Sequence, residues 1–210
     1  MSKHKILSNE FISEGVYTLK LSRESVDFTP GACASIMSRV YSIASTPIDD
    51  YLTFHIRRID GGAVSDKLCN YKIGDTVQID DVFQYFFPGK DCANHKYSFI
   101  STGTGLSPLA SALQWYQHKP HTILAGARYL RDISFLSPYH TIGTENIALV
   151  ASRDGVRQRV TDYLHLLPIE ADHRYFICGL DAMIDDVSNY LCNNGIEFNQ
   201  ISTEQFFYTT

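Results

Sequence analysis

The sequence has 210 residues, a length that accommodates two compact domains of about 100 residues each. Its formal net charge is −5, with acidic and basic residues interspersed, which excludes the basic field of a nucleic-acid-binding protein. No apolar run reaches the roughly 18 residues needed to cross a bilayer. Residues 1–15 lack the apolar core of a signal peptide. We therefore expect a cytoplasmic protein that binds neither a membrane nor a nucleic acid.

The cysteines and histidines give no sign of a metal site. The five cysteines form no CxxC pair, and their odd number indicates free thiols. The eight histidines form no HExxH pattern, so no metal is expected. The spacing CxxxxCxxC, which is typical of a ferredoxin-type iron–sulfur module, does not occur.

Up to about residue 90, the sequence predicts short strands separated by turns. Several strands alternate polar and apolar residues, and Gly or Pro residues separate them. The expected strands cover residues 4–12, 16–22, 39–45, 52–59, 75–80 and 83–87. Short strands at this spacing predict a small antiparallel β-barrel.

After residue 95, apolar strands alternate with helical segments. The expected strands cover residues 97–101, 122–127, 146–152, 174–179 and 198–202. The expected helices cover residues 107–117, 131–139, 156–167 and 181–195. This alternation predicts an α/β Rossmann-like parallel sheet with helices on both faces. The two domains are accordingly expected to cover residues 1–92 and 93–210.

A glycine-containing turn, TGTGLSP at residues 102–108, joins the first strand of the second half to its first helix. Gly103 and Gly105 allow a backbone to approach a pyrophosphate, and a helix beginning near Ser107 would direct its N–H groups at the anion. The segment is not a strict GxGxxG motif, because Pro108 stands in the third glycine position, and it is not a P-loop. A plain tight turn is the alternative.

Arginines follow the next two strands, where dinucleotide-binding folds usually carry an acid for the ribose hydroxyls. They are Arg128 after the first of these strands, and Arg153, Arg157 and Arg159, with Ser152, after the second. In a net-negative chain, arginines grouped at strand ends indicate a receptor for an additional phosphate, and hence NADP rather than NAD. Charge on a helix surface is the alternative, above all for Arg157.

Five segments in this order resemble the ferredoxin–NADP reductase family of flavoproteins, and the likeness covers nearly the whole chain. They are RVYS (39–42), GGAVS (61–65), TGTGLSP (102–108), CGLDAM (178–183) and the acid–x–aromatic EQF (204–206). The stretches GARYLRDISF and SRDGVRQRVTD look most like the bacterial ferredoxin/flavodoxin reductases. The resemblance implies an FAD-binding β-barrel followed by an NADP-binding α/β domain.

On the flavin side, the resemblance implies that Arg39 binds the pyrophosphate and that Tyr41 packs on the isoalloxazine ring. The Ser42 hydroxyl would hydrogen-bond flavin N5, the atom that receives hydride. An ordinary strand aromatic is the alternative for Tyr41. The remaining flavin contacts implied are His55 and Arg57 along the adenylate, and Gly62, Ala63, Val64 and Ser65 at a helix N-terminus that binds the pyrophosphate. A helix cap is the alternative for Ser65.

On the nucleotide side, the resemblance implies Thr104 between flavin and nicotinamide, Cys178 beside the reacting carbons, and Glu204 near the nicotinamide. Phe206 or Phe207 would cover the flavin face until the nicotinamide displaces it. The remaining NADP contacts implied are Gly105, Arg128, Ser152, Arg153, Arg159, Gly179 and Met183. Ser42, Cys178, Glu204 and Phe206 are therefore the expected catalytic residues. An inert core thiol and a simple hydrophobic anchor are the alternatives for Cys178 and the phenylalanines.

Three departures from the family pattern bear on the cofactor. Val40 replaces a frequent proline, and Leu180 with Asp181 replaces the usual Asn-Pro pair. The flavin domain is short where many relatives carry a longer loop toward the adenine. FMN therefore stays an alternative to FAD.

The expected activity is that of an FAD-dependent oxidoreductase. Hydride would pass from NADPH to the flavin, and single electrons would leave to ferredoxin, flavodoxin or another separate acceptor. One alternative is an NADH-dependent reductase component of an oxygenase, or a flavin reductase. An alternative of another class is a non-catalytic, flavin-binding electron-transfer subunit.

Overall fold

The computed structural model describes residues 2–13, 15–84, 86, 95–116, 120–133, 146–155 and 157–205. The chain divides into two compact units. The first unit comprises residues 1–87 with 107–115, and the second comprises residues 88–106 with 116–210. The expected domain boundary at residues 92 and 93 lies outside the described residues and stays a prediction.

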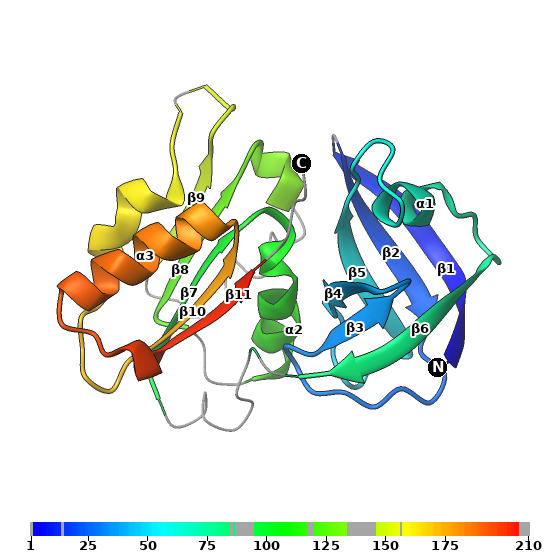
Figure 1. The fold of residues 1–210 in the computed structure, drawn as a ribbon, viewed down its shortest axis with the longest axis horizontal. Coiled ribbons are helices and arrows are strands. Elements are labelled where there is room, and N and C mark those ends of the chain that lie inside the picture. The colour runs from blue at the N-terminus through cyan, green and yellow to red at the C-terminus, as the bar shows by residue number, and fades with distance from the viewer. Residues whose placement is uncertain are drawn as a thin grey trace. The chain divides into compact units, whose positions relative to one another are not determined.

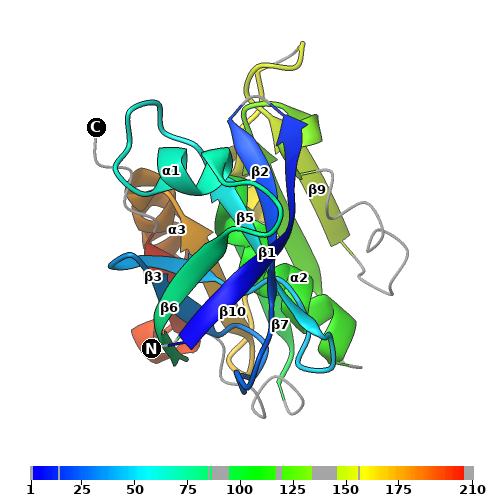
Figure 2. The ribbon, with the colours of Figure 1, turned by 90° about the vertical axis from the view of Figure 1, so that its right-hand side faces the viewer.

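The first unit is a six-stranded antiparallel sheet in the order β4-β3-β6-β1-β2-β5. Its strands are β1 (Ser2–Ser13), β2 (Val16–Ser22), β3 (Cys33–Ile36), β4 (Arg39–Ser42), β5 (Tyr51–Arg57) and β6 (Thr76–Phe83). Beyond β4, the N–H of Ala44 donates to the carbonyl of Thr53 in β5 at 2.8 Å. The two ends of the sheet therefore meet, as the closure of a small barrel requires. Figure 2 looks onto strands β1, β2 and β6.

Two helices belong to this unit, α1 (Ser65–Asn70) and α2 (Ser107–Trp115). The hydroxyl of Ser111 on α2 donates to the carbonyl of Ser45 at 2.7 Å. The core of the sheet follows the alternation expected of strands, since Leu52, Phe54 and Ile56 of β5 are all buried. The remaining hydrophobic side chains of this cluster include Ile6, Leu19, Leu21, Ala34, Ile36, Val77 and Ile79.

The sequence missed β3 and divided β6 in two. β3 consists of CASI, whose small residues carry no strand pattern of their own; it forms because it pairs with β4 and β6. β6 continues through the acids at 80 and 81, and the register shift opposite Ser35 and Ile36 marks a bulge there. The strand expected at residues 83–87 is wrong at Gln84, which is already outside β6, while Tyr85 and Phe87 lie outside the described residues.

The second unit is a parallel five-stranded sheet in the order β11-β10-β7-β8-β9 (Figure 1). Its strands are β7 (Tyr97–Thr102), β8 (Thr122–Ala127), β9 (Asn146–Ala151), β10 (Arg174–Gly179) and β11 (Ile201–Gln205). The chain builds β8 and β9 on one side of β7 and then places β10 and β11 on the other. The strand order therefore reverses between β7 and β10, and ligands of such sheets bind at the carboxyl ends of the strands at that point.

Helix α3 (Asp181–Asn193) lies across one face of this sheet (Figure 1). Its buried face consists of Met183, Ile184, Val187 and Leu191, as helical spacing predicts. The 3₁₀ helix η4 (Val160–Leu166) adds Val160 and Leu164 to the same hydrophobic cluster. Two further 3₁₀ helices are η2 (Gly103–Leu106) and η5 (Phe198–Gln200).

The long helix expected at residues 156–167 is wrong. Residue 159 has extended backbone angles, and only residues 160–166 are helical, as 3₁₀ helix. The cause is local, because the Asp162 carboxylate accepts the N–H of Arg159 at 2.8 Å and so begins the helix there. The strand expected at 198–202 begins only at Ile201, after η5. Of the helix expected at 131–139, residues 134–139 lie outside the described residues.

Within the described ranges, no helix combines the length and the apolar character needed to cross a membrane. In the same part of the chain, no group of three or more His, Cys, Asp or Glu side chains could hold a metal ion.

A buried histidine at the amino end of β10 gives a testable acid sensitivity. His173 is fully buried, and its Nε2 lies 2.8 Å from the hydroxyl of Ser98. Its ring packs on Tyr175, with the ring centroids 4.9 Å apart. Burial lowers the pKa of His173 from 6.5 to about 4, and the neighbouring His121 adds to the shift.

Between these two pKa values the unfolded chain binds a proton at residue 173 that the folded chain does not. We therefore expect the free energy of unfolding to fall as the pH is lowered from 6.5 toward 4. His173→Gln should flatten this acid dependence in urea unfolding measured at several pH values. Equal slopes for both proteins would show that His173 does not titrate in this way.

Candidate functional site

The carboxyl ends of β7 and β10 are joined by a side-chain hydrogen bond at the point where the strand order reverses. The N–H of Leu180 donates to Thr102 Oγ1 at 3.1 Å. Between these residues and the end of β10, Gly179 has φ +141°, and a Cβ built there would collide with Thr102 Oγ1. Glycine is therefore required at position 179, so that the Thr102 hydroxyl can reach the start of α3.

We expect Gly179→Ala to lower the free energy of unfolding by about 2–5 kcal/mol, because backbone strain and overpacking add at this position. Gly195→Ala is the matched control, since Gly195 also has a positive φ but its Cβ would meet nothing within 4 Å. The control should cost only about 1–2 kcal/mol. Urea unfolding measures both variants, and equal losses would refute the packing argument.

The glycine turn packs against the end of β10. A Cβ at Gly105 would lie 2.6 Å from the carbonyl oxygen of Cys178, so glycine lets η2 approach that strand. Gly103 has φ +58°, in the left-handed region. The sequence predicted that Gly105 leaves room for a pyrophosphate. In the structure it leaves room for the Cys178 carbonyl, and Thr104 is buried between the two glycines.

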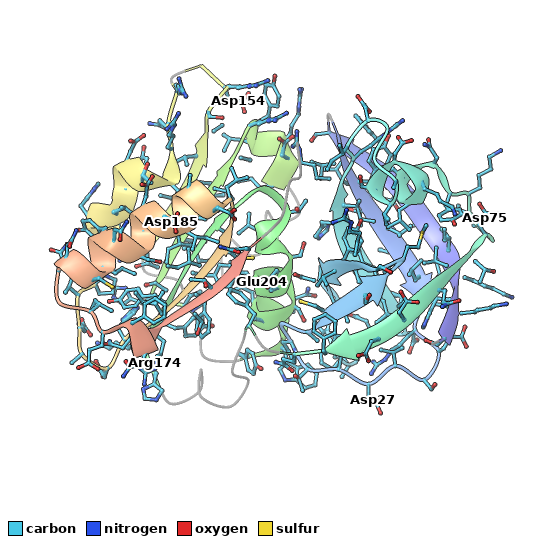
Figure 3. The ribbon with its side chains drawn as sticks, in the orientation of Figure 1. Asp27, Asp75, Asp154, Arg174, Asp185 and Glu204 are labelled. Atoms are coloured by element: carbon cyan, nitrogen blue, oxygen red, sulfur yellow. The ribbon has the colours of Figure 1, made fainter. Side chains whose placement is uncertain are left out.

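A cysteine and a glutamate lie side by side at the same edge. Cys178 and Glu204 are cross-strand partners in the β10–β11 register. Their side chains are 0% and 3% exposed, and Cys178 Sγ lies 3.9 Å from Glu204 Oε2. Figure 3 labels Glu204 on β11. The structure therefore brings together two of the expected catalytic residues. Met183, by contrast, belongs to the hydrophobic cluster beneath α3, so its side chain serves the core.

The loops that carry the arginines run side by side beyond β8 and β9. The N–H of Ser152 donates to the carbonyl of Ala127 at 3.0 Å, and the N–H of Arg153 donates to the carbonyl of Arg128 at 2.9 Å. Arg128, Arg153 and Arg159 are exposed. Three of the expected phosphate-binding side chains therefore come from the same end of the sheet.

Nearby carboxylates bind backbone N–H groups instead of these guanidinium groups. Asp132 accepts the N–H of Tyr129 at 3.3 Å, and Asp154 accepts the N–H of Leu130 at 2.6 Å. As noted above, Asp162 accepts the N–H of Arg159. Among the described residues, Arg128, Arg153, Arg157 and Arg159 form no ion pair. Their positive charges are therefore available to an anion.

On β4 of the first unit, Arg39 is exposed, Tyr41 is half-buried and Ser42 is 3% exposed. Burial raises the pKa of Tyr41 to about 12, and the neighbouring Arg39 opposes part of the shift, so the phenol stays neutral. Ser42 Oγ lies 3.7 Å from Cys33 Sγ on β3. Adjacent strand residues point to opposite faces, so a ring contacted by both Tyr41 and Ser42 must lie across the end of β4.

His55 of β5 is buried, and its Nδ1 lies 3.1 Å from the hydroxyl of Thr18. Burial lowers the pKa of His55 to about 3, so the ring is neutral above that pH. Arg57, the last residue of β5, is half-buried and forms no ion pair in the described part of the chain. Arg57, together with Arg39, can therefore supply positive charge for a diphosphate, whereas His55 cannot.

The segment before α1 forms a compact turn. A Cβ at Gly62 would lie 2.8 Å from the carbonyl oxygen of Ile59, so glycine is required for this turn. Ser65 is the first residue of α1, and its hydroxyl accepts the N–H of Ile59 at 3.1 Å. The helix-cap interpretation of Ser65 is therefore wrong, because its hydroxyl fixes the preceding turn. Ala63 and Val64 complete the link to α1, as the resemblance implied.

The expected tail residues Phe206 and Phe207 lie outside the described residues, so their placement stays a prediction. Two contacts of the site were missed from the sequence, the Thr102 hydroxyl and the Asp154 carboxylate. Each precedes a glycine and adjoins a motif that was noted, TGTG and SRDG. That adjacency is the signal that could have found them.

The donors on the page fit a flavin dinucleotide and a phosphorylated pyridine nucleotide. Arg39 and Arg57 are positive on the barrel, and the arginines beyond β8 and β9 have no carboxylate partner in the described residues. An antiparallel barrel with a separate sheet of this order is the architecture of a flavoprotein reductase.

The chain belongs to the ferredoxin–NADP reductase family. It is 30% identical over 196 residues to a flavodoxin/ferredoxin–NADP reductase of Buchnera aphidicola, covering 82% of this chain and 76% of the relative. It is 26% identical to the ferredoxin–NAD(P)+ reductase component of a naphthalene dioxygenase/salicylate hydroxylase system from Ralstonia, and spans 63% of that relative. No family model matches the chain.

Solved structures confirm the fold. A ferredoxin–NADP+ reductase from Neisseria gonorrhoeae, determined with bound FAD and NADP, superposes with a TM-score of 0.87. The match covers 98% of each chain at 20% identity. Both expected parts, the barrel and the parallel sheet, are therefore confirmed, and the chain is an oxidoreductase of this family.

Proposed function

We propose that the chain is an FAD-dependent reductase that takes hydride from NADPH and passes single electrons to a separate acceptor such as ferredoxin or flavodoxin. The observation that carries the choice of nucleotide is the group of arginines beyond β8 and β9, which have no carboxylate partner in the described residues. An additional phosphate on the adenosine ribose is the anion that such a group selects. The similar reductase from Neisseria, whose structure holds FAD and NADP, supports the same choice.

In this proposal the chain orients the reactants, and the flavin, when bound, supplies the capacity to accept hydride and release electrons one at a time. Arg39 and Arg57 bind the flavin diphosphate, with the turn at residues 62–65 beside it. Tyr41 packs on the ring, and Ser42 hydrogen-bonds N5. His55 contributes only as a neutral group because of its lowered pKa.

On the nucleotide side, Thr104 and the Gly105 backbone contact the nicotinamide half. Cys178 and Glu204 lie beside each other at the edge where that ring would bind. Arg128, Ser152, Arg153 and Arg159 bind the phosphates at the adenosine end. Gly179 shapes the start of α3, and Met183 is assigned to the core. Such positioning lowers the barrier to transfer because it brings the reacting atoms into close approach.

The proposal is tested by mixing the flavin-loaded chain anaerobically with NADPH or NADH and following the flavin absorbance. We expect much faster bleaching with NADPH. Equal rates, or faster bleaching with NADH, would favour the second candidate, an NADH-dependent reductase component of an oxygenase. The similarity to the Ralstonia reductase component is the observation that favours this candidate. A flavin that neither nucleotide reduces would favour a non-catalytic electron-transfer subunit.

Three points stay predictions. FAD is preferred to FMN, and identification of the flavin released from the protein decides between them. Phe206 or Phe207 is expected to cover the flavin face. A cytoplasmic location is expected from the sequence.

A further inference from the structure

We propose that Asp154 is a positioning residue for nucleotide selectivity. By accepting the N–H of Leu130, its carboxylate holds the loops that carry Arg128 and Arg153 in the relative placement that a 2′-phosphate requires. This inference rests on the proposed use of NADPH and extends it to a residue that does not itself contact the nucleotide.

The geometry is that of a strand ladder prolonged by a side chain. β8 and β9 end in register at Ala127 and Ala151. Beyond this pair, two backbone hydrogen bonds join the loops, from Ser152 to Ala127 at 3.0 Å and from Arg153 to Arg128 at 2.9 Å. The next connection is made by the carboxylate, since Leu130 N donates to Asp154 Oδ2 at 2.6 Å. The contact therefore fixes the loops one step past the backbone ladder.

The loop that contains Asp154 is also fixed where it returns. The N–H of Gln158 donates to the carbonyl of Ala151 at 3.1 Å, so residues 152–157 form a closed excursion. Gly155 has φ +69° and turns the chain just after the aspartate. Figure 3 shows Asp154 in this loop beyond β9. The carboxylate therefore ties the far part of the loop to the neighbouring segment that begins at Arg128.

The charge of Asp154 is compatible with an anion site beside it. Among the described residues, its carboxylate forms no ion pair with a guanidinium group. It accepts a backbone N–H instead, so it orders the two arginines without neutralising them. An acid in a phosphate-binding loop would otherwise oppose the ligand. The hydrogen bond, and not the negative charge, is therefore the useful property of this side chain.

This distinction defines the test. Asp154→Ala removes the acceptor, whereas Asp154→Asn keeps an acceptor oxygen and removes the charge. Asp185→Ala, which removes an exposed acid from α3, is the control for net charge. Isothermal titration of the flavin-loaded full chain with 2′-phospho-AMP and with AMP gives the binding constants. Steady-state rates with NADPH and NADH, together with thermal unfolding, complete the comparison.

We expect Asp154→Ala to weaken 2′-phospho-AMP binding by about tenfold, the effect of losing alignment of one charge-assisted contact. AMP binding, kcat and the unfolding temperature should stay close to wild type, while KM for NADPH rises and KM for NADH does not. Asp154→Asn and Asp185→Ala should bind 2′-phospho-AMP within about twofold of wild type.

A merely structural role would lower the unfolding temperature or weaken AMP and 2′-phospho-AMP equally, and either result overturns the inference. Unchanged binding in Asp154→Ala, or failure of Asp154→Asn to restore it, does the same. If the wild-type chain itself does not prefer 2′-phospho-AMP to AMP, the proposed use of NADPH is wrong. If that preference is present and persists in Asp154→Ala, only the role of Asp154 is wrong.

Discussion

Replacing Arg153 or Arg159 by alanine should weaken NADPH binding by about 10- to 150-fold and leave NADH binding nearly unchanged. Each lost charge-assisted contact costs on the order of 1.5–3 kcal/mol, which corresponds to that range of dissociation constants. The effect should be confined to NADPH because NADH lacks the 2′-phosphate. Titration of the flavin-loaded protein with each nucleotide measures it.

Arg174→Ala is the matched control. Arg174 begins β10, at the opposite end of the strands from Arg153 and Arg159, so this variant removes the same charge from the other edge of the sheet. It should bind both nucleotides as the wild type does. Equal losses of NADPH and NADH in the Arg153 and Arg159 variants would place these arginines on the shared pyrophosphate or outside the site.

Ser42→Ala should lower the rate of flavin reduction at saturating NADPH by about 100-fold. The proposed hydrogen bond is made to the atom that receives hydride, and removing one such aligned group typically costs rates of this order. Because Ser42 is 3% exposed and lies beside Cys33, its hydroxyl is held in one environment before any ligand binds. Stopped-flow absorbance under anaerobic conditions measures the rate directly.

Ser8→Ala supplies the control, since Ser8 lies on β1 and its hydroxyl has no hydrogen-bond partner among the described residues. It should reduce the flavin at the wild-type rate. If Ser42→Ala is reduced as fast as Ser8→Ala, then Ser42 does not contact the reacting atom, and the end of β4 is not where the ring binds.

The strands that the sequence predicted well carry their own signal. β2 alternates, and β7, β8 and β10 are short apolar runs bounded by turns, so their pattern matches their burial. The strand β3 carries no such signal, because Cys33 and Ala34 are small and the strand exists through its neighbours. The segment at 156–167 has helical spacing, but the Asp162 cap confines the helix to residues 160–166. Tertiary pairing and local capping override the pattern in these two places.

For the site, residue type at strand ends was informative and side-chain geometry was not. The arginines beyond β8 and β9 could be expected together because parallel strands end at one edge. The pairing of Cys178 with Glu204 required the β10–β11 register, which no local pattern specifies. The bond from Leu130 to Asp154 joins residues 24 positions apart, and the bond from Leu180 to Thr102 joins residues 78 apart. Contacts of this kind follow from the fold and not from a motif.

The most direct test of the central claim is the visible absorption spectrum of the purified chain, before and after anaerobic addition of NADPH, with the released flavin identified. The account expects the band of an oxidised flavin, its loss on adding NADPH, and FAD on release. A colourless chain that takes up neither FAD nor FMN when offered them would contradict it.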